Sequence, residues 1–251
     1  MKTKGFNGKT EFHVDEIALK KGHSDFETII YTEEGVIDSM KGKKSIDLQA
    51  LLRSIPGIGQ IQRVCMDMCA PFADAIRQVL PGAEIVIDRF HIMKLLNKKL
   101  DKLRIKTTKK LEVPLQKEFA KIRFSLFKDE RHLNREKHEF VQKYLALNTE
   151  MKDIYRLCQN FRQILFPEKS LNQLDASRQL TDWCTQARKH LGRFVKTLES
   201  WWDEVVNACV YPLNNGRAEG FNNKIKLMKR MGFGYRNRET FKLRIQAACN
   251  P

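Results

Sequence analysis

Hydrophobic and polar positions follow three different patterns along the chain, which divide it into three blocks. The first block, residues 10 to about 88, alternates short apolar runs of strand type with helically spaced ones. Glu33-Glu34-Gly35 predicts a turn between its second and third strands. The predicted order is β-β-β-α-β-α-β, carried in turn by EFHVDEIAL, FETIIY, GVIDSM, SIDLQALLRSI, IQRVCMDM, APFADAIRQVL and EIVID.

The second block, from about 89 to 212, has helical spacing of its apolar residues almost throughout and few glycines. Its expected breaks are Pro114, Pro167 and Pro212, because proline interrupts a helix. This pattern predicts an all-α segment that packs its own core.

The third block, 213 to 251, opens with one further helix. Asn214 or Asn215 can cap its start, and the pattern carries it to about Met231. Its apolar stripe lies at i, i+4 and i+7, on Phe221, Ile225 and Met228.

The net charge of the chain narrows the classes of binding partner that are expected. The sequence has 46 Lys and Arg against 30 Asp and Glu, a formal charge of +16. A chain this basic is expected to attract polyanions, with nucleic acid first and an anionic membrane second, although a solvated basic surface is the ordinary alternative. No apolar run is long enough to cross a membrane, and six scattered cysteines without a signal peptide favour a cytoplasmic location.

Four acidic residues stand where phosphodiester chemistry could use them. Asp15 lies inside the first strand, where acids are disfavoured, and an edge strand is its structural alternative. Asp67 and Asp88 each end a strand, where α/β folds place ligand groups, but either could also cap the following helix. Glu219 lies one turn into the last block's helix, where the helix dipole alone favours an acid.

Three long motifs resemble the catalytic region of bacterial insertion-sequence transposases of the DDE type, in the group called ISL-three. They lie within residues 10–105 and 211–247, and the middle block matches only as a helical segment of suitable length. The motifs are HVDEIALKKGHSDFETIIY, RVCMDMCAPFADAIRQVLPGAEIVIDRFHIMKLLNKKLDKLR and NNGRAEGFNNKIKLMKRMGFGYRNRETFKLRI.

The resemblance implies an α/β fold, a ribonuclease-H-like mixed sheet (β-β-β-α-β-α-β-α) with a large all-α insertion. The catalytic core would occupy residues 1–88 and 213–251, and the insertion residues 89–212. It implies a DDE triad of Asp15, Asp67 and Glu219, with Asp88 competing for the second place. Such a triad would hold Mg²⁺ or Mn²⁺, two ions in all, because these metals prefer carboxylate oxygens.

The implied activity is cleavage of DNA at transposon ends, followed by attack of the freed 3′ hydroxyl on target DNA. Lys226, Lys229 and Arg230 would contact phosphates beside the acids, with a solvated basic face as their alternative. The expected partners are transposon-end and target DNA in the nucleoid. No membrane partner is expected, and the oligomeric state is open, a homo-oligomer included.

Two other functions stay open. One is a related ribonuclease-H-like nuclease that does not transpose. The other is a truncated, non-catalytic DNA-binding remnant, because family members usually carry an N-terminal zinc-binding and helix-turn-helix region that this sequence does not show.

Overall fold

A computed structural model describes residues 5–6, 8–18, 26–213, 215–232, 235 and 237–250, with the side chains at 217–219 and 238 excepted. The chain forms two compact units. One comprises residues 1–88 together with 211–251, and the other residues 89–210. Each is described by itself.

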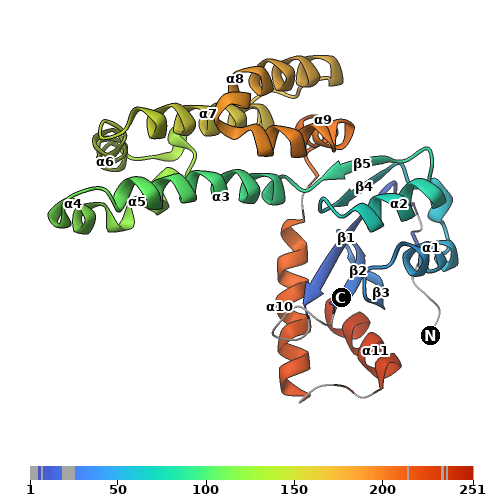
Figure 1. The fold of residues 1–251 in the computed structure, drawn as a ribbon. Helices are drawn as coiled ribbons and strands as arrows, with labels where there is room; N and C mark the ends of the chain where they lie inside the picture. The colour runs from blue at the N-terminus through green and yellow to red at the C-terminus, as the bar shows by residue number, and fades with distance from the viewer. Residues whose placement is uncertain are drawn as a thin grey trace. The chain divides into compact units, whose positions relative to one another are not determined.

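The first unit is built on a five-stranded mixed sheet in the order β3-β2-β1-β4-β5 (Figure 1). The first three strands form an antiparallel meander, and β4 and β5 continue the sheet in parallel beside β1. The predicted order of strands and helices, and with it the fold class, is confirmed. The elements are β1 (Glu11–Ala18), β2 (Phe26–Thr32), β3 (Gly35–Lys41), α1 (Ser45–Ser54), β4 (Arg63–Met66), α2 (Ala70–Val79), β5 (Glu84–Ile87), α10 (Gly216–Met231) and α11 (Arg238–Cys249).

The two faces of this sheet are covered by different helices. The chain crosses from β3 to β4 through α1 and from β4 to β5 through α2, both times in the direction of β5. Because such crossovers are right-handed, α1 and α2 lie on one face of the sheet. The other face carries alternate residues of the strands and packs against α10 and α11. That cluster consists of Ile17, Ile29, Tyr31, Val36, Ile225, Phe241, Ile245 and Cys249, with Phe221, Met228 and Tyr235 against it. The apolar stripe predicted for the last block's helix is therefore confirmed.

The second unit is helical, as its sequence pattern predicts. Its core includes a group of three aromatic rings, in which Phe161 lies 4.6 Å from Trp183 and 5.4 Å from Phe194. Pro114 is in the first turn of α4, and Pro167 and Pro212 lie between helices, as expected from the loss of a backbone donor. The helices are α3 (Arg89–Thr108), α4 (Val113–Glu118), α5 (Ile122–Leu126), α6 (Arg135–Leu145), α7 (Thr149–Leu165), α8 (Gln173–Glu199) and α9 (Trp202–Val210), with short 3-10 turns at Phe119–Lys121 and Glu130–His132. A further 3-10 turn, Ile58–Gln60, lies in the first unit between α1 and β4.

No helix in the described part of the chain combines the length and the apolar character that a membrane span needs.

Candidate active site

Asp15 is a buried acid whose carboxylate is held at both oxygens. It lies in β1, and its side chain is on the sheet face that α10 covers. The backbone N–H of Glu16 donates to Oδ1 at 2.8 Å, and the Asn222 side-chain amide of α10 donates to Oδ2 at 2.8 Å. With only 8% of the residue exposed, these bonds offset part of the cost of burying an acid inside a strand. The edge-strand alternative is wrong, because β1 lies at the centre of the sheet.

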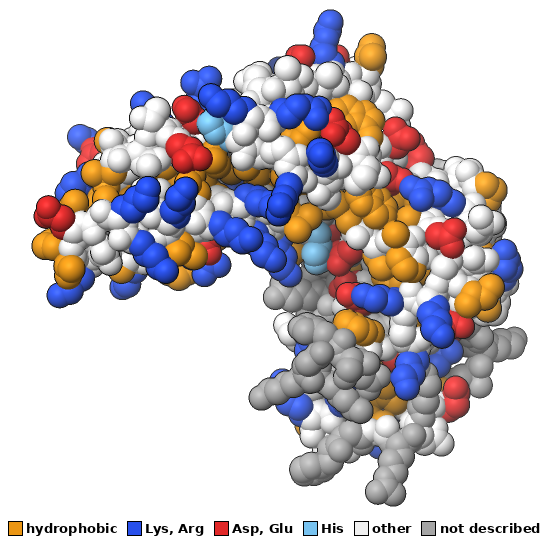
Figure 2. All heavy atoms as spheres, viewed as in Figure 1, with side chains coloured by type: hydrophobic (Ala, Val, Ile, Leu, Met, Phe, Trp, Pro, Cys, Tyr) orange, Lys and Arg blue, Asp and Glu red, His pale blue; other side chains and the backbone are white. Residues whose placement is uncertain are grey.

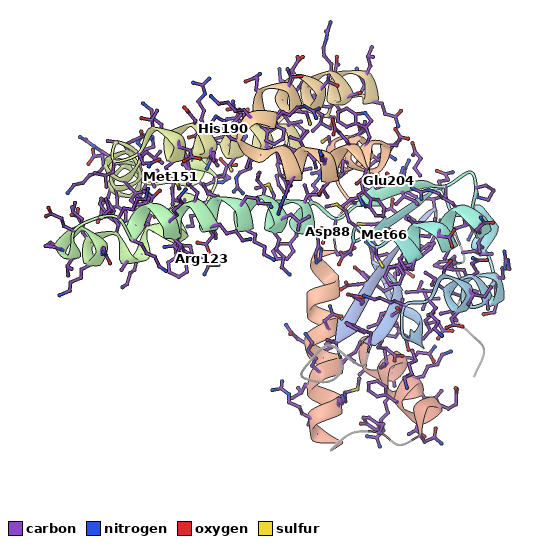
Figure 3. The ribbon with its side chains drawn as sticks, in the orientation of Figure 1. Met66, Asp88, Arg123, Met151, His190 and Glu204 are labelled. Atoms are coloured by element: carbon purple, nitrogen blue, oxygen red, sulfur yellow. The ribbon has the colours of Figure 1, made fainter. Side chains whose placement is uncertain are left out.

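Two further acids lie in register with Asp15 across the sheet. Val14 pairs with Met66 on β4, and Met66 pairs with Ile87 on β5. One residue further, this register brings Asp15 opposite Asp67, and Asp67 opposite Asp88. Figure 3 labels Met66 and Asp88 beside each other, where β4 and β5 end. We call Asp15, Asp67 and Asp88 the carboxylate row.

Strand spacing sets the distances along the carboxylate row. Neighbouring strands lie about 4.8 Å apart, so Asp67 is one strand from Asp15, whereas Asp88 is two strands away. Carboxylate oxygens of Asp67 and Asp88 lie within 4.8 Å of each other. Like charges this close repel, and a divalent cation relieves such repulsion. The hard oxygen donors of the row fit Mg²⁺ or Mn²⁺.

A second hydrogen bond joins β1 to the start of α10. Asn215 occupies the N-cap position of α10, as predicted, but its side chain makes no capping bond there. Instead its Oδ1 lies 3.0 Å from Nδ1 of His13, two residues before Asp15 on the same face of β1. Asn214, the other predicted cap, lies outside the described residues. The Asn215 side chain, which could have capped α10, therefore binds His13 of the sheet instead.

His13 and Tyr31 form a stacked pair beside the carboxylate row. Their ring centroids are 5.0 Å apart, and Phe221 of α10 meets the Tyr31 ring edge-on at 5.5 Å. Burial lowers the pKa of His13, although the bond to Asn215 opposes this shift. Burial raises the pKa of Tyr31, and the Asp15 carboxylate raises it further. Both shifts favour the uncharged form of these rings beside the acids.

Glu219, the third acid of the predicted triad, lies in the first turn of α10. Its side chain lies outside the described residues. Its backbone position is three residues before Asn222, and residues three apart are neighbours on one side of a helix. Because Asn222 contacts Asp15, position 219 is on the side of α10 that is turned toward Asp15.

The three basic residues predicted to bind DNA lie further along α10. Lys226 and Arg230 are exposed, and Lys229 is partly buried. Lys226 follows Asn222 by four residues and so continues the same side of the helix.

Sequence reasoning missed His13, Asn215 as its partner, and Asn222. A signal was present for two of them. His13 precedes Asp15 by two residues, the period of one strand face, and Asn222 follows Glu219 by three, the period of one helix side. The bond from Asn215 to His13 has no such signal, because 202 residues separate the two.

Comparison with known proteins identifies the family to which the chain belongs. A family model described as "Transposase", that of the DDE-type ISL-three group, matches residues 12–245. The chain is also similar to the transposase for insertion sequence element IS1001 of Bordetella parapertussis, at 28% identity over 246 residues. That alignment covers 94% of this chain and 60% of the relative, so the chain spans less than two thirds of its length. With the family model matching nearly all of both units, the chain belongs to the ISL-three family of DDE transposases.

Proposed function

We propose that this chain cleaves DNA and joins the cut end to a target, with a divalent metal site built from Asp15, Asp67 and Glu219. The observation that carries the proposal is the carboxylate row: acids from distant parts of the sequence meet on one sheet face, and α10 covers that face. The helical unit 89–210 would be an insertion in the catalytic core, because it lies between the last strand and α10.

Strand order favours Asp67 over Asp88 as the second acid. The two ions of a two-metal site lie roughly 4 Å apart, so their shared ligands must be close neighbours. Asp67 neighbours Asp15 on the adjacent strand, whereas Asp88 has a whole strand between itself and Asp15. The Asp88 carboxylate lies within 4.8 Å of the Asp67 carboxylate, on the side away from Asp15, so Asp88 would assist Asp67 in holding the metal.

Each of the chain's own groups has a defined task in this proposal. Mg²⁺ or Mn²⁺, when bound, supplies positive charge at the scissile phosphate and favours ionisation of the attacking hydroxyl or water. Asn222 and the Glu16 backbone N–H orient the Asp15 carboxylate, so its lone pairs are directed before any metal arrives. Lys226 and Arg230, both exposed on α10, would bind phosphates.

The proposal is tested with supercoiled plasmid incubated with the full chain and Mg²⁺, Mn²⁺ or EDTA. We expect nicking or linearisation with either metal and none in EDTA. Asp15→Asn, Asp67→Asn and Glu219→Gln should each abolish cleavage while leaving DNA binding nearly intact. A chain that binds DNA but never cleaves it in either metal would be the non-catalytic remnant.

A second assay separates a transposase from a related nuclease. Oligonucleotides with a free 3′ end are offered together with target plasmid, and joined products are detected by primer extension across the junction. Cleavage without any joined product would identify a nuclease of the same fold. Joining that requires all three acids would support the proposal.

A further inference from the structure

Four lysines follow one another along α3 at four-residue spacing. They are Lys94, Lys98, Lys102 and Lys106, and all are exposed. Because residues four apart are neighbours on a helix surface, they form a single line, which we call the lysine row. From Lys94 to Lys106 it rises through twelve residue steps, about 18 Å at 1.5 Å per step. Figure 2 shows Lys and Arg side chains gathered over the part of the helical unit where α3 runs.

Packing within the helical unit fixes the direction of the lysine row. The opposite side of α3 buries Ile92, Met93, Leu96 and Leu100. That side contacts α7 and α8 of the same unit. The helix therefore cannot turn the lysines inward without exposing its apolar side, and the row stays directed at solvent.

The lysine row costs helix stability. Each like-charged pair at i, i+4 destabilises a helix, and the row contains three consecutive pairs. No ion pair offsets this within the part of the chain that the structure describes. The acid of this helix, Asp101, is bound instead to Arg104 at 2.7 Å and to Arg123 at 3.6 Å. A fold selected for stability alone would alternate the signs of charge here.

We propose that the lysine row binds the phosphate backbone of duplex DNA. This proposal rests on the proposed function, in which DNA is the substrate, and adds a second DNA-contact surface on the helical unit. A duplex carries one negative charge per about 1.7 Å of axis when both strands are counted, so about 18 Å of duplex carries about ten phosphates, of which those on the near side can face these four lysines. Contacts of this kind position DNA and carry no sequence information.

An anionic membrane is the competing partner, and the packing of α3 disfavours it. A helix that lies in a membrane interface needs a free apolar side to enter the lipid. The apolar side of α3 is already buried in its own unit. The exposed large apolar residues of α3 are Phe90, Leu95 and Ile105, at 65%, 38% and 41%, and three residues scattered among the lysines do not form a second apolar side.

The test measures DNA affinity of the full chain against salt concentration, in EDTA so that no cleavage occurs. The probe is a fluorescein-labelled duplex of about three helical turns and arbitrary sequence. The row variant carries Lys94→Gln, Lys98→Gln, Lys102→Gln and Lys106→Gln. The matched control removes the same charge from other exposed positions of the helical unit, by Lys137→Gln, Lys152→Gln, Lys189→Gln and Lys196→Gln.

We expect the slope of log affinity against log salt to become shallower by about 3 to 4 in the row variant, at about 0.9 per lost contact. The control should change the slope by less than about 1. Equal effects of the two variants, or no effect of the row variant, would overturn the proposal. So would a row variant that loses binding to phosphatidylserine vesicles and keeps its DNA slope.

Two further measurements keep the result interpretable. The row variant should melt at the same temperature as the parent chain or higher, because repulsion has been removed. If it is less stable, the four single substitutions replace it, each with an expected slope change of about 1. A parent chain that binds through the row but does not cleave in Mg²⁺ would refute the proposed function alone. A chain that cleaves but whose row variants bind as the parent does would refute the lysine row alone.

Discussion

Replacing Asp67 by asparagine should stabilise the metal-free protein and abolish its stabilisation by metal. The Asp67 and Asp88 carboxylates lie within 4.8 Å of each other. At that separation, Coulomb's law gives a repulsion of about 3.5 kcal/mol at an effective dielectric constant of about 20, and about 1 kcal/mol in bulk water. Asp67→Asn removes this repulsion at nearly constant volume. We therefore expect a gain of about 1–3 kcal/mol in the free energy of unfolding.

Mg²⁺ should reverse the order of stability, so that the parent chain becomes more stable than Asp67→Asn. A ligand at one hundred times its dissociation constant stabilises the folded state by about 2.7 kcal/mol. The parent chain should gain that amount, and Asp67→Asn, which has lost a ligand, should gain little. Thermal unfolding followed by circular dichroism in EDTA and in Mg²⁺ measures both effects, at about 2–4 °C per kcal/mol for a chain of this size.

The control for this prediction is Asp47→Asn, the same chemical change in the exposed first turn of α1. It should lower stability slightly, through the helix dipole, and leave the response to Mg²⁺ unchanged. The reasoning is refuted if Asp67→Asn melts lower than the parent in EDTA, or if Mg²⁺ stabilises it as much as the parent. Asp88→Asn should also relieve the repulsion but keep measurable cleavage, because Asp88 is two strands from Asp15.

Three more substitutions test other parts of the structure. Asn222→Ala removes the hydrogen bond to Oδ2 of Asp15 and should weaken metal affinity or cleavage about 10- to 100-fold, measured by Mn²⁺ titration. Lys242→Ala leaves the Asp38 carboxylate, 3% exposed and 2.6 Å from the lysine, without its ion pair, and should cost about 1–3 kcal/mol in urea unfolding. Phe161→Ala should cost about 3–5 kcal/mol through the cavity it leaves; a loss under 1 kcal/mol would contradict the packing of that aromatic group.

The sequence by itself determined the order of elements and the residue types of the site. Short apolar runs bounded by turns predicted strands, so the order β-β-β-α-β-α-β was readable before any contact was known. The stripe Phe221, Ile225 and Met228 likewise decided which side of α10 is buried. Asp15 was recognisable because an acid inside a strand requires a compensating partner.

Only the tertiary structure decided which groups meet. The register of β1, β4 and β5 depends on pairing between strands up to about fifty residues apart, and a shift of one residue would turn every side chain to the other face. The same holds for the partners of Asp15 and His13, which lie on a helix more than two hundred residues away. Local periodicity carries no information about such pairs, because their geometry arises only when the sheet and α10 bury a common apolar cluster.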